Sequence, residues 1–166
     1  MLTDLVQIRQ LGLEKVNENI EFHRHLAASK EGFRPIENLT GEFAQQMNCV
    51  SCGNCCRWAT PPASGREIAA IAKYFGMTAR EVREKYTWPD DERPGRRKLR
   101  SNKDGCVFLS GTLCLVYPAR PHGCHAFPPI RKLKKSFVRE FCRWASLCPI
   151  VYNAIETCKE RLEYRG

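Results

Sequence analysis

The segment Cys49-Val-Ser-Cys52-Gly-Asn-Cys55-Cys56 places four thiols within eight residues. Two thiols separated by two residues can bind one metal, because a tight turn brings both sulfurs to a common point. A third thiol at the same interval favours an iron–sulfur cluster, whose corners a wrapping loop meets in sequence, over a single tetrahedral ion. The segment therefore predicts a thiolate metal centre, with a [4Fe–4S] cluster as the favoured cofactor and zinc as the alternative.

Five further cysteines at irregular spacing complete the set of candidate metal ligands. The nine predicted ligands are Cys49, Cys52, Cys55, Cys56, Cys106, Cys114, Cys124, Cys142 and Cys148. Because the adjacent Cys55 and Cys56 point in different directions on any backbone, we expect them to serve two neighbouring centres. One partition joins the first three cysteines to a remote residue, and the other joins Cys56 to the 106–124 group. His122 and His125 flank Cys124, but hydrogen bonding is the simpler role for both.

The composition agrees with metal binding in a reducing compartment. The chain has 166 residues, ten cysteines and no apolar run long enough for a signal peptide or a membrane span. We therefore expect a cytoplasmic protein, in which dense cysteines more often hold metal or do redox chemistry than form disulfides. The net charge of +9 is concentrated in residues 90–135, which carry +7. This excess either offsets negatively charged thiolate centres or marks a basic surface for nucleic acid.

Start and stop signals predict a set of short elements. Capping boxes open at Ser64 and Thr78, and Pro149 suits a first helical turn. The predicted elements are a helix over 3–29, an extended connector over 30–48, helices over 64–75 and 78–87, a loop over 89–105, a hairpin turning at Gly111, irregular structure through the prolines at 118–129, and a final helix over 149–163.

Two of these helices carry an apolar face. The stripe of the first is Leu13, Val16, Ile20 and His23, and that of the last is Val151, Ile155, Cys158 and Leu162. We therefore expect Cys158 to be a core residue rather than a ligand. The first helix either packs on its own domain or docks onto a partner, such as a larger redox or protein complex.

Together these elements predict an α+β fold: a small, irregular, metal-stapled domain with several short helices, one β-hairpin and a flanking N-terminal helix. The predicted division places the N-terminal helix and connector in residues 1–48 and the cysteine-cluster domain in residues 49–166.

Several short motifs occur in a fixed order along the chain. They are Cys49, Cys52, Cys55, Cys56 and Arg57, then Gly105-Cys106-Val-Phe-Leu, then Cys114-Leu-Val-Tyr117, Arg120-Pro121, Cys124, Phe127-Pro128 and Cys148-Pro149. In this combination the chain resembles the YkgJ-like proteins, which carry the CxxCxxCC domain described as zinc- or iron-chelating. The resemblance covers about residues 49–150 and implies metal binding. His125 stands where that family commonly has an arginine.

The leading hypothesis for function is electron transfer, or service as an accessory subunit of a redox assembly. Structural or storage zinc, with nucleic acid bound by the basic loops, is one alternative. The cysteine cluster also resembles one found in the flagellin lysine methylases. A metal-dependent protein-modifying enzyme is therefore another alternative. The sequence contains no GxGxxG, P-loop, HExxH or CxxxCxxC motif, so any catalysis has to occur at the metal and no catalytic residue is assigned.

Overall fold

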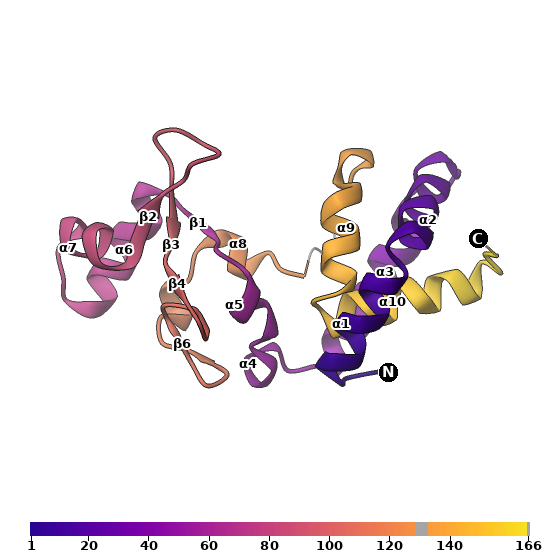
Figure 1. The fold of residues 1–166 in the computed structure, drawn as a ribbon, viewed down its shortest axis with the longest axis horizontal. Coiled ribbons are helices and arrows are strands. Elements are labelled where there is room, and N and C mark those ends of the chain that lie inside the picture. Colours follow the sequence, from indigo (N-terminus) through magenta and orange to yellow (C-terminus); the bar gives the residue numbers. More distant parts are fainter. Residues whose placement is uncertain (129–132, 166) are drawn as a thin grey trace. The chain divides into compact units, whose positions relative to one another are not determined.

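The computed structural model describes residues 1–128 and 133–165 (Figure 1). The chain divides into two units, one made of Met1–Asn48 with Pro128–Gly166 and the other of Cys49–Phe127. We call them the helical unit and the cysteine unit. The first boundary between the two units follows residue 48. Residues 128–166, which the predicted division assigned to the cysteine domain, group instead with residues 1–48.

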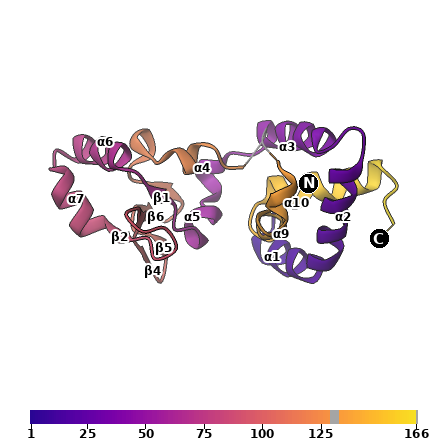
Figure 2. The same cartoon turned by 90° about the horizontal axis from the view of Figure 1, so that it is seen from above.

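Helices build the described part of the helical unit (Figure 2). They are α1 (Leu5–Glu14), α2 (Val16–Ala28), α3 (Arg34–Gln46), the 3-10 turn η2 (Lys135–Phe137), α9 (Val138–Ala145) and α10 (Pro149–Arg161). Helix α10 packs against α3, and α9 packs against α1, α2 and α10. Helix α9 was not predicted from the sequence. None of the helices is long and apolar enough to cross a membrane, as far as the described residues extend.

The prediction of one helix over 3–29 is wrong, because the chain breaks at Lys15 between α1 and α2. The break shifts the helical phase, so Leu13 is exposed while Ile8 and Phe22 are buried. Gly12 lies inside α1, where a Cβ would come within 2.5 Å of the Cα of Ser146. The glycine therefore permits the close approach of α1 to the end of α9.

The predicted connector over 30–48 is also wrong, since α3 fills most of it. Pro35 lies in the first turn of α3, where a missing backbone N–H leaves no helical hydrogen bond unmade. Ile36 and Leu39 are buried on its inner face. The final helix begins at Pro149 as predicted.

The predicted face of this final helix is confirmed at three positions and wrong at the fourth. Val151, Ile155 and Cys158 are buried. Leu162 follows the last helical residue and is exposed, because the helix ends at Arg161 before it can complete the stripe.

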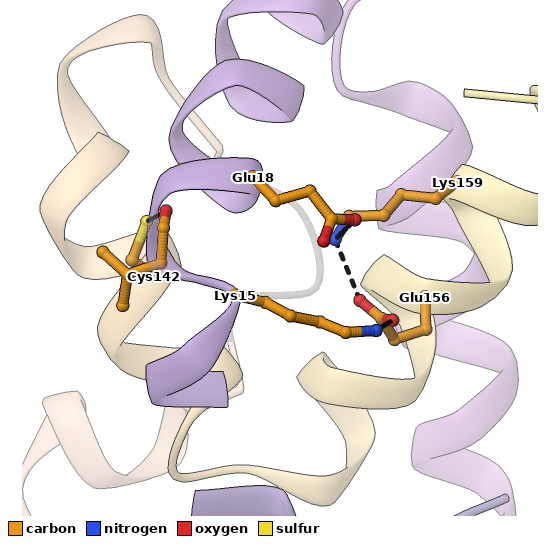
Figure 3. A network of polar contacts seen from close by, with 6 residues as sticks. Lys15, Glu18, Cys142, Glu156 and Lys159 are labelled. Carbon is orange, nitrogen blue, oxygen red and sulfur yellow. Dashed lines mark hydrogen bonds and ion pairs between the residues drawn. The ribbon is translucent and has the colours of Figure 1, made fainter. Parts of the chain in front are cut away.

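A network of charged side chains joins α2 and α10 inside the helical unit (Figure 3). The Lys159 side chain is 6% exposed, and its Nζ lies 2.6 Å from Glu18 Oε1 and 2.9 Å from Glu156 Oε1. Lys15 contacts the other oxygen of Glu156. Burial alone would raise the pKa of Glu156, but the hydrogen bonds and charges of Lys15 and Lys159 outweigh it and hold the pKa below its ordinary value. The pairing explains how a lysine is tolerated in this interior.

The helical unit is expected to lose stability in mild acid because of His23. This ring is buried between Phe33 and Phe141, its Nε2 lies 3.2 Å from the carbonyl oxygen of Lys134, and burial lowers its pKa from 6.5. Below about pH 6.5 the unfolded chain therefore binds a proton that the folded chain resists, and the free energy of unfolding falls as the pH falls. Urea unfolding between pH 5 and pH 8 should show a smaller pH dependence in His23→Gln. An equal dependence in both proteins would contradict the assignment to His23.

The cysteine unit combines short helices with short antiparallel strands, which confirms the predicted α+β class. Its elements are α4 (Cys49–Cys52), α5 (Asn54–Trp58), β1 (Pro62–Ala63), α6 (Gly65–Phe75), α7 (Ala79–Tyr86), β2 (Thr87–Pro89), β3 (Arg97–Leu99), β4 (Ser101–Asn102), β5 (Gly105–Cys106), β6 (Leu109–Ser110), β7 (Leu113–Cys114), η1 (Tyr117–Ala119) and α8 (His122–His125). The strands form a sheet in the order β1-β3-β2 and two pairs, β4-β5 and β6-β7.

Most local signals of this unit are confirmed. Both predicted capping boxes are present, at Ser64 and Thr78, and Gly111 turns the β6-β7 pair with a φ of 62°. Cys106, however, pairs with the preceding strand β4 rather than within the Gly111 hairpin. The predicted loop over 89–105 contains the central strand of the sheet, because Leu99 is apolar enough to be buried there.

The proline-rich segment is more regular than predicted over residues 118–128, since η1 and α8 each form one turn with a proline near the start. Pro129 lies outside the described residues. Pro118 lies in the first turn of η1, and Pro121 precedes α8 as its cap. Proline is compatible with both places because its fixed φ suits a first turn and its missing N–H is not needed there. Cys124 is thereby carried on a defined helical turn.

Candidate metal centre

Four cysteine side chains from four separate elements lie close together in the cysteine unit. They are Cys56 on α5, Cys106 on β5, Cys114 on β7 and Cys124 on α8. The neighbouring thiols of Cys56, Cys106 and Cys114 each raise the pKa of Cys124. Cys56 also raises the pKa values of Cys106 and Cys114. We call these residues the four-thiol group. The partition that joins Cys56 to the 106–124 group as metal ligands stays a prediction.

Cys106 and Cys114 occupy equivalent local structures at the ends of β5 and β7. The backbone of Phe108 hydrogen-bonds to the sulfur of Cys106, and the backbone of Val116 hydrogen-bonds to that of Cys114. Phe108 and Val116 are both buried in the hydrophobic core of the unit. Each cysteine is therefore followed, two residues later, by a buried apolar residue. The burial of that side chain holds its own backbone amide beside the sulfur, where the amide stabilises the thiolate. The repeated pattern Cys-x-apolar is the signal for this arrangement in the sequence.

Gly105 brings β5 against α5. Its φ is 120°, and a Cβ built on it would lie 2.5 Å from the Cα of Arg57 and 2.6 Å from the carbonyl oxygen of Cys56. Gly53 makes a similar approach, since its Cβ would lie 3.0 Å from the Cα of Thr112. These glycines let the cysteine-rich helices pack on the backbone of both hairpins, which is how Cys56 comes near Cys106 and Cys114.

The segments that carry the thiols of the cysteine unit have only cationic charged residues. Segments 49–65 and 105–127 contain no Asp or Glu, and Arg57 and Arg120 are their only Lys or Arg residues. Arg57 donates hydrogen bonds to the carbonyl oxygens of Cys52, at 3.1 Å, and Gly111, at 3.3 Å. It thus joins α4 to the hairpin turn.

Arg120 is positioned by its own neighbours. Its Nε donates to Nδ1 of His125 at 3.2 Å, and its guanidinium carbon lies 3.7 Å from the centre of the Tyr117 ring. Its charge favours the thiolate forms of Cys56 and Cys124. Two arginines beside four thiols provide the charge that a dianionic metal–tetrathiolate needs.

The thiols differ in how readily they ionise. A hydrogen bond from Cys55, together with the charges of Arg57 and Arg120, lowers the pKa of Cys56 to about 7 despite burial. Burial raises the pKa of Cys106 to about 11 and that of Cys124 to about 12, and their thiol neighbours add to both shifts. Cys56 is therefore the member most readily available as a thiolate near neutral pH, and the others must release protons when they bind metal.

Glu67 connects helix α6 to the turn that carries Cys124. Its Oε2 accepts from the backbone and hydroxyl of Ser64, at 2.7 and 2.6 Å, and its Oε1 accepts from the backbone N–H of His122 at 2.7 Å. Partial burial would raise the pKa of Glu67, but these hydrogen bonds outweigh it and lower the pKa. The capping box was visible in the sequence, whereas the bond to His122 spans 55 residues and left no local signal.

Replacing Glu67 by Gln is expected to weaken this connection. The amide keeps one acceptor oxygen, so it cannot cap α6 and hold α8 in the same geometry, and we expect a loss of about 1 kcal/mol of stability. The capping-box variant Glu81→Gln on α7 is a matched control, because the hydrogen bonds of Glu81 to other described residues outside its helix go to Thr78 at its own helix start. Metal retention in competition with a chelator should fall for Glu67→Gln and stay unchanged for Glu81→Gln. Equal retention in both variants would show that Glu67 does not support the Cys124 turn.

The other cysteines of the CxxCxxCC segment lie beside the four-thiol group. Cys49 and Cys52 share the single turn of α4, and burial, with the charge of Cys52, raises the pKa of Cys49. Cys55 hydrogen-bonds to Cys56, so the expectation that these adjacent side chains diverge is wrong.

The remaining cysteines belong to the helical unit, where all three are buried. The Cys142 thiol lies 3.7 Å from the carbonyl oxygen of Val16 (Figure 3), and Cys148 precedes the first turn of α10. Cys158 is 1% exposed on α10, the core position predicted for it. Ligation by Cys142 or Cys148 stays a prediction.

The donor set fits a thiophilic metal in its chemistry, since four thiols gather with two arginines and two backbone amides beside them. Its members are neighbours rather than a closed shell: across residues 1–128 and 133–165, no three Cys, His, Asp or Glu side chains are arranged to enclose an ion. The four-thiol group would have to turn its side chains inward to hold zinc or iron.

Comparison with known proteins identifies the segment that carries these features. The family model CxxCxxCC, described as "Putative zinc- or iron-chelating domain", matches residues 48–144, which is more than half of the chain. No curated protein and no solved structure matches. The matched segment includes the whole cysteine unit, with the four-thiol group and both arginines. The chain therefore belongs to the CxxCxxCC family of zinc- or iron-chelating domains, and its function is metal binding.

Proposed function

We propose that Cys56, Cys106, Cys114 and Cys124 hold a [4Fe–4S] cluster and that the protein transfers electrons, either alone or as an accessory subunit of a redox assembly. The observation that carries the proposal is the approach of four thiols from four elements, two of which receive backbone hydrogen bonds. Cysteine thiolates are the usual ligands of such clusters, and hydrogen bonds to their sulfurs tune the reduction potential. When bound, the cluster would supply one-electron chemistry.

The surface beside Cys114 supports electron transfer. Leu113 and Leu115 flank this half-buried cysteine and are 57% and 51% exposed, and the Tyr117 ring follows at 41% exposed. Exposed apolar side chains beside a redox centre allow a partner to approach closely and exclude water. A purely structural metal site has no need of such a surface.

The second candidate is a structural zinc site on the same four thiols. It is favoured by the origin of the ligands in four short elements, because closed zinc sites commonly join segments that have little regular structure of their own. Cys49, Cys52 and Cys55 then remain for a second centre, as in the partition predicted from the sequence.

Anaerobic purification separates these candidates. Analysis of iron, zinc and acid-labile sulfide, with visible absorbance before and after dithionite, should give about four iron and four sulfide per chain and absorbance that is reversibly bleached. A colourless protein with stoichiometric zinc would select the zinc candidate, because Zn²⁺ has no redox chemistry. A protein that is folded and free of both metals would overturn the two together.

A further inference from the structure

We propose that the outer face of the β1-β3-β2 sheet binds single-stranded nucleic acid, with a base stacked on Trp88 and phosphates contacted by Lys98 and Arg100. The sheet lies in the cysteine unit (Figure 1), and the inference does not depend on which metal the four-thiol group holds.

The register of the sheet places these side chains on one face. Trp88 on β2 and Pro62 on β1 both pair directly with Lys98 on β3. Directly paired residues project to the same side of an antiparallel sheet, and their neighbours along each strand project to the other. The neighbours Thr87 and Leu99 are buried, whereas Trp88 is 39% exposed, so the row through Trp88 and Lys98 faces solvent.

Arg100 extends this row past the end of β3. The chain stays paired here, since the backbone N–H of Arg100 donates to the carbonyl oxygen of Tyr86 at 2.8 Å. The guanidinium carbon lies 5.7 Å from the centre of the Trp88 ring. Two backbone carbonyls hold the group in place: Nη2 donates to Glu84 at 2.8 Å and Nε to Thr87 at 3.2 Å. The cation is therefore preorganised beside the indole.

The surrounding charge is complementary to a polyanion. Residues 83–103 contain eight Lys or Arg and four Asp or Glu, and Arg93, Arg96 and Lys103 are exposed. Lys98 forms an ion pair with Asp91, with 3.2 Å between Nζ and Oδ2. The Asp91 side chain is 87% exposed, and ion pairs at such exposed positions are weak, so a phosphate can compete with Asp91 for Lys98.

The exposed indole distinguishes single strands from other anions. A base in a single strand presents its flat face, and stacking of that face on an aromatic side chain strengthens binding with little dependence on the base. A duplex hides those faces between base pairs, and an acidic peptide has none. Charge alone would explain binding to any of these polymers, whereas stacking on Trp88 predicts a preference for single-stranded nucleic acid over a duplex or an acidic peptide.

The test is fluorescence anisotropy of the full chain with a labelled oligothymidylate of about 12 nucleotides, at about 50 and 200 mM salt. Trp88→Ala should weaken binding about tenfold, and Trp88→Phe should restore most of the loss. Arg100→Gln should reduce the slope of log K against log salt by about 0.7, as for one lost phosphate contact. Asp91→Asn should tighten binding.

Trp58→Ala is the matched control, because Trp58 is an exposed tryptophan of the same unit on α5, outside the sheet. It should bind like the unchanged protein. Unfolding curves of all variants show whether each one is folded. Absence of binding at about 50 mM salt would overturn the proposal. So would equal affinity of the Trp88→Ala and Trp58→Ala proteins, or equal displacement by a duplex or by polyglutamate.

Discussion

Replacement of Cys124 by Ser is expected to remove the metal centre and to loosen the cysteine unit as a whole. Cys124 brings α8 to thiols from α5, β5 and β7, and ligand binding energy in such a site is also folding energy, on the order of 10 kcal/mol for zinc-dependent domains. We expect bound metal to fall from stoichiometric to near zero, with proteolysis accelerated across residues 49–127. Metal analysis and limited proteolysis, read by mass spectrometry, measure both effects.

Cys158→Ala is the matched control for this loss. Cys158 is a buried cysteine of the helical unit, so its replacement should lower stability by about 1–3 kcal/mol through a small cavity and leave the metal content unchanged. Equal metal content in the Cys124→Ser and unchanged proteins would contradict the assignment of Cys124. Loss of metal in Cys158→Ala would contradict its assignment to the core.

Replacement of Gly105 by Ala is expected to separate the thiols without removing any of them. The new Cβ would meet the backbone at Cys56 and Arg57 at 2.5–2.6 Å, and a φ of 120° is strained for any other residue. The two effects together should cost about 3–5 kcal/mol, either as lost stability or as weakened metal binding. Thermal unfolding of the metal-bound protein and competition with a chelator measure the two losses.

Gly95→Ala separates backbone strain from the steric clash. Gly95 also has a positive φ, 79°, but nothing lies within 4 Å of its Cβ position. It should lose about 1 kcal/mol and keep its metal. If Gly105→Ala were no worse than Gly95→Ala, the close packing of β5 on α5 would not be what gathers the thiols.

The sequence predicts those parts of the fold that have local causes. Ser64 and Thr78 each carry their own capping partner three residues away, and Gly111 supplies the positive φ of its own turn. Helix α3 was missed because Pro35 suggests a break, although in a first turn it is compatible with a helix.

The division into units depends on contacts between residues far apart in sequence. Helix α10 packs on α3, more than 100 positions earlier in the chain. The apolar periodicity of a helix indicates which face is buried but not which element covers it. The periodicity of one helix does not identify the other as its packing partner. The predicted division therefore did not group residues 128–166 with residues 1–48.

The candidate site was predictable in composition but not in arrangement. Spacing identified the cysteines and suggested that Cys56 joins the 106–124 group. It did not reveal that Gly105 must lie against Cys56, or that Glu67 holds the turn of Cys124. Both depend on backbone positions that only the folded chain defines.

X-ray absorption spectroscopy at the edge of the bound metal, on anaerobically purified protein, tests the four-thiol centre most directly. The predicted spectrum has a first shell made of sulfur alone, as four cysteine ligands and cluster sulfide require, and it disappears in Cys124→Ser. Nitrogen or oxygen in the first shell, or the same spectrum in Cys124→Ser and in the unchanged protein, would contradict a metal centre on Cys56, Cys106, Cys114 and Cys124.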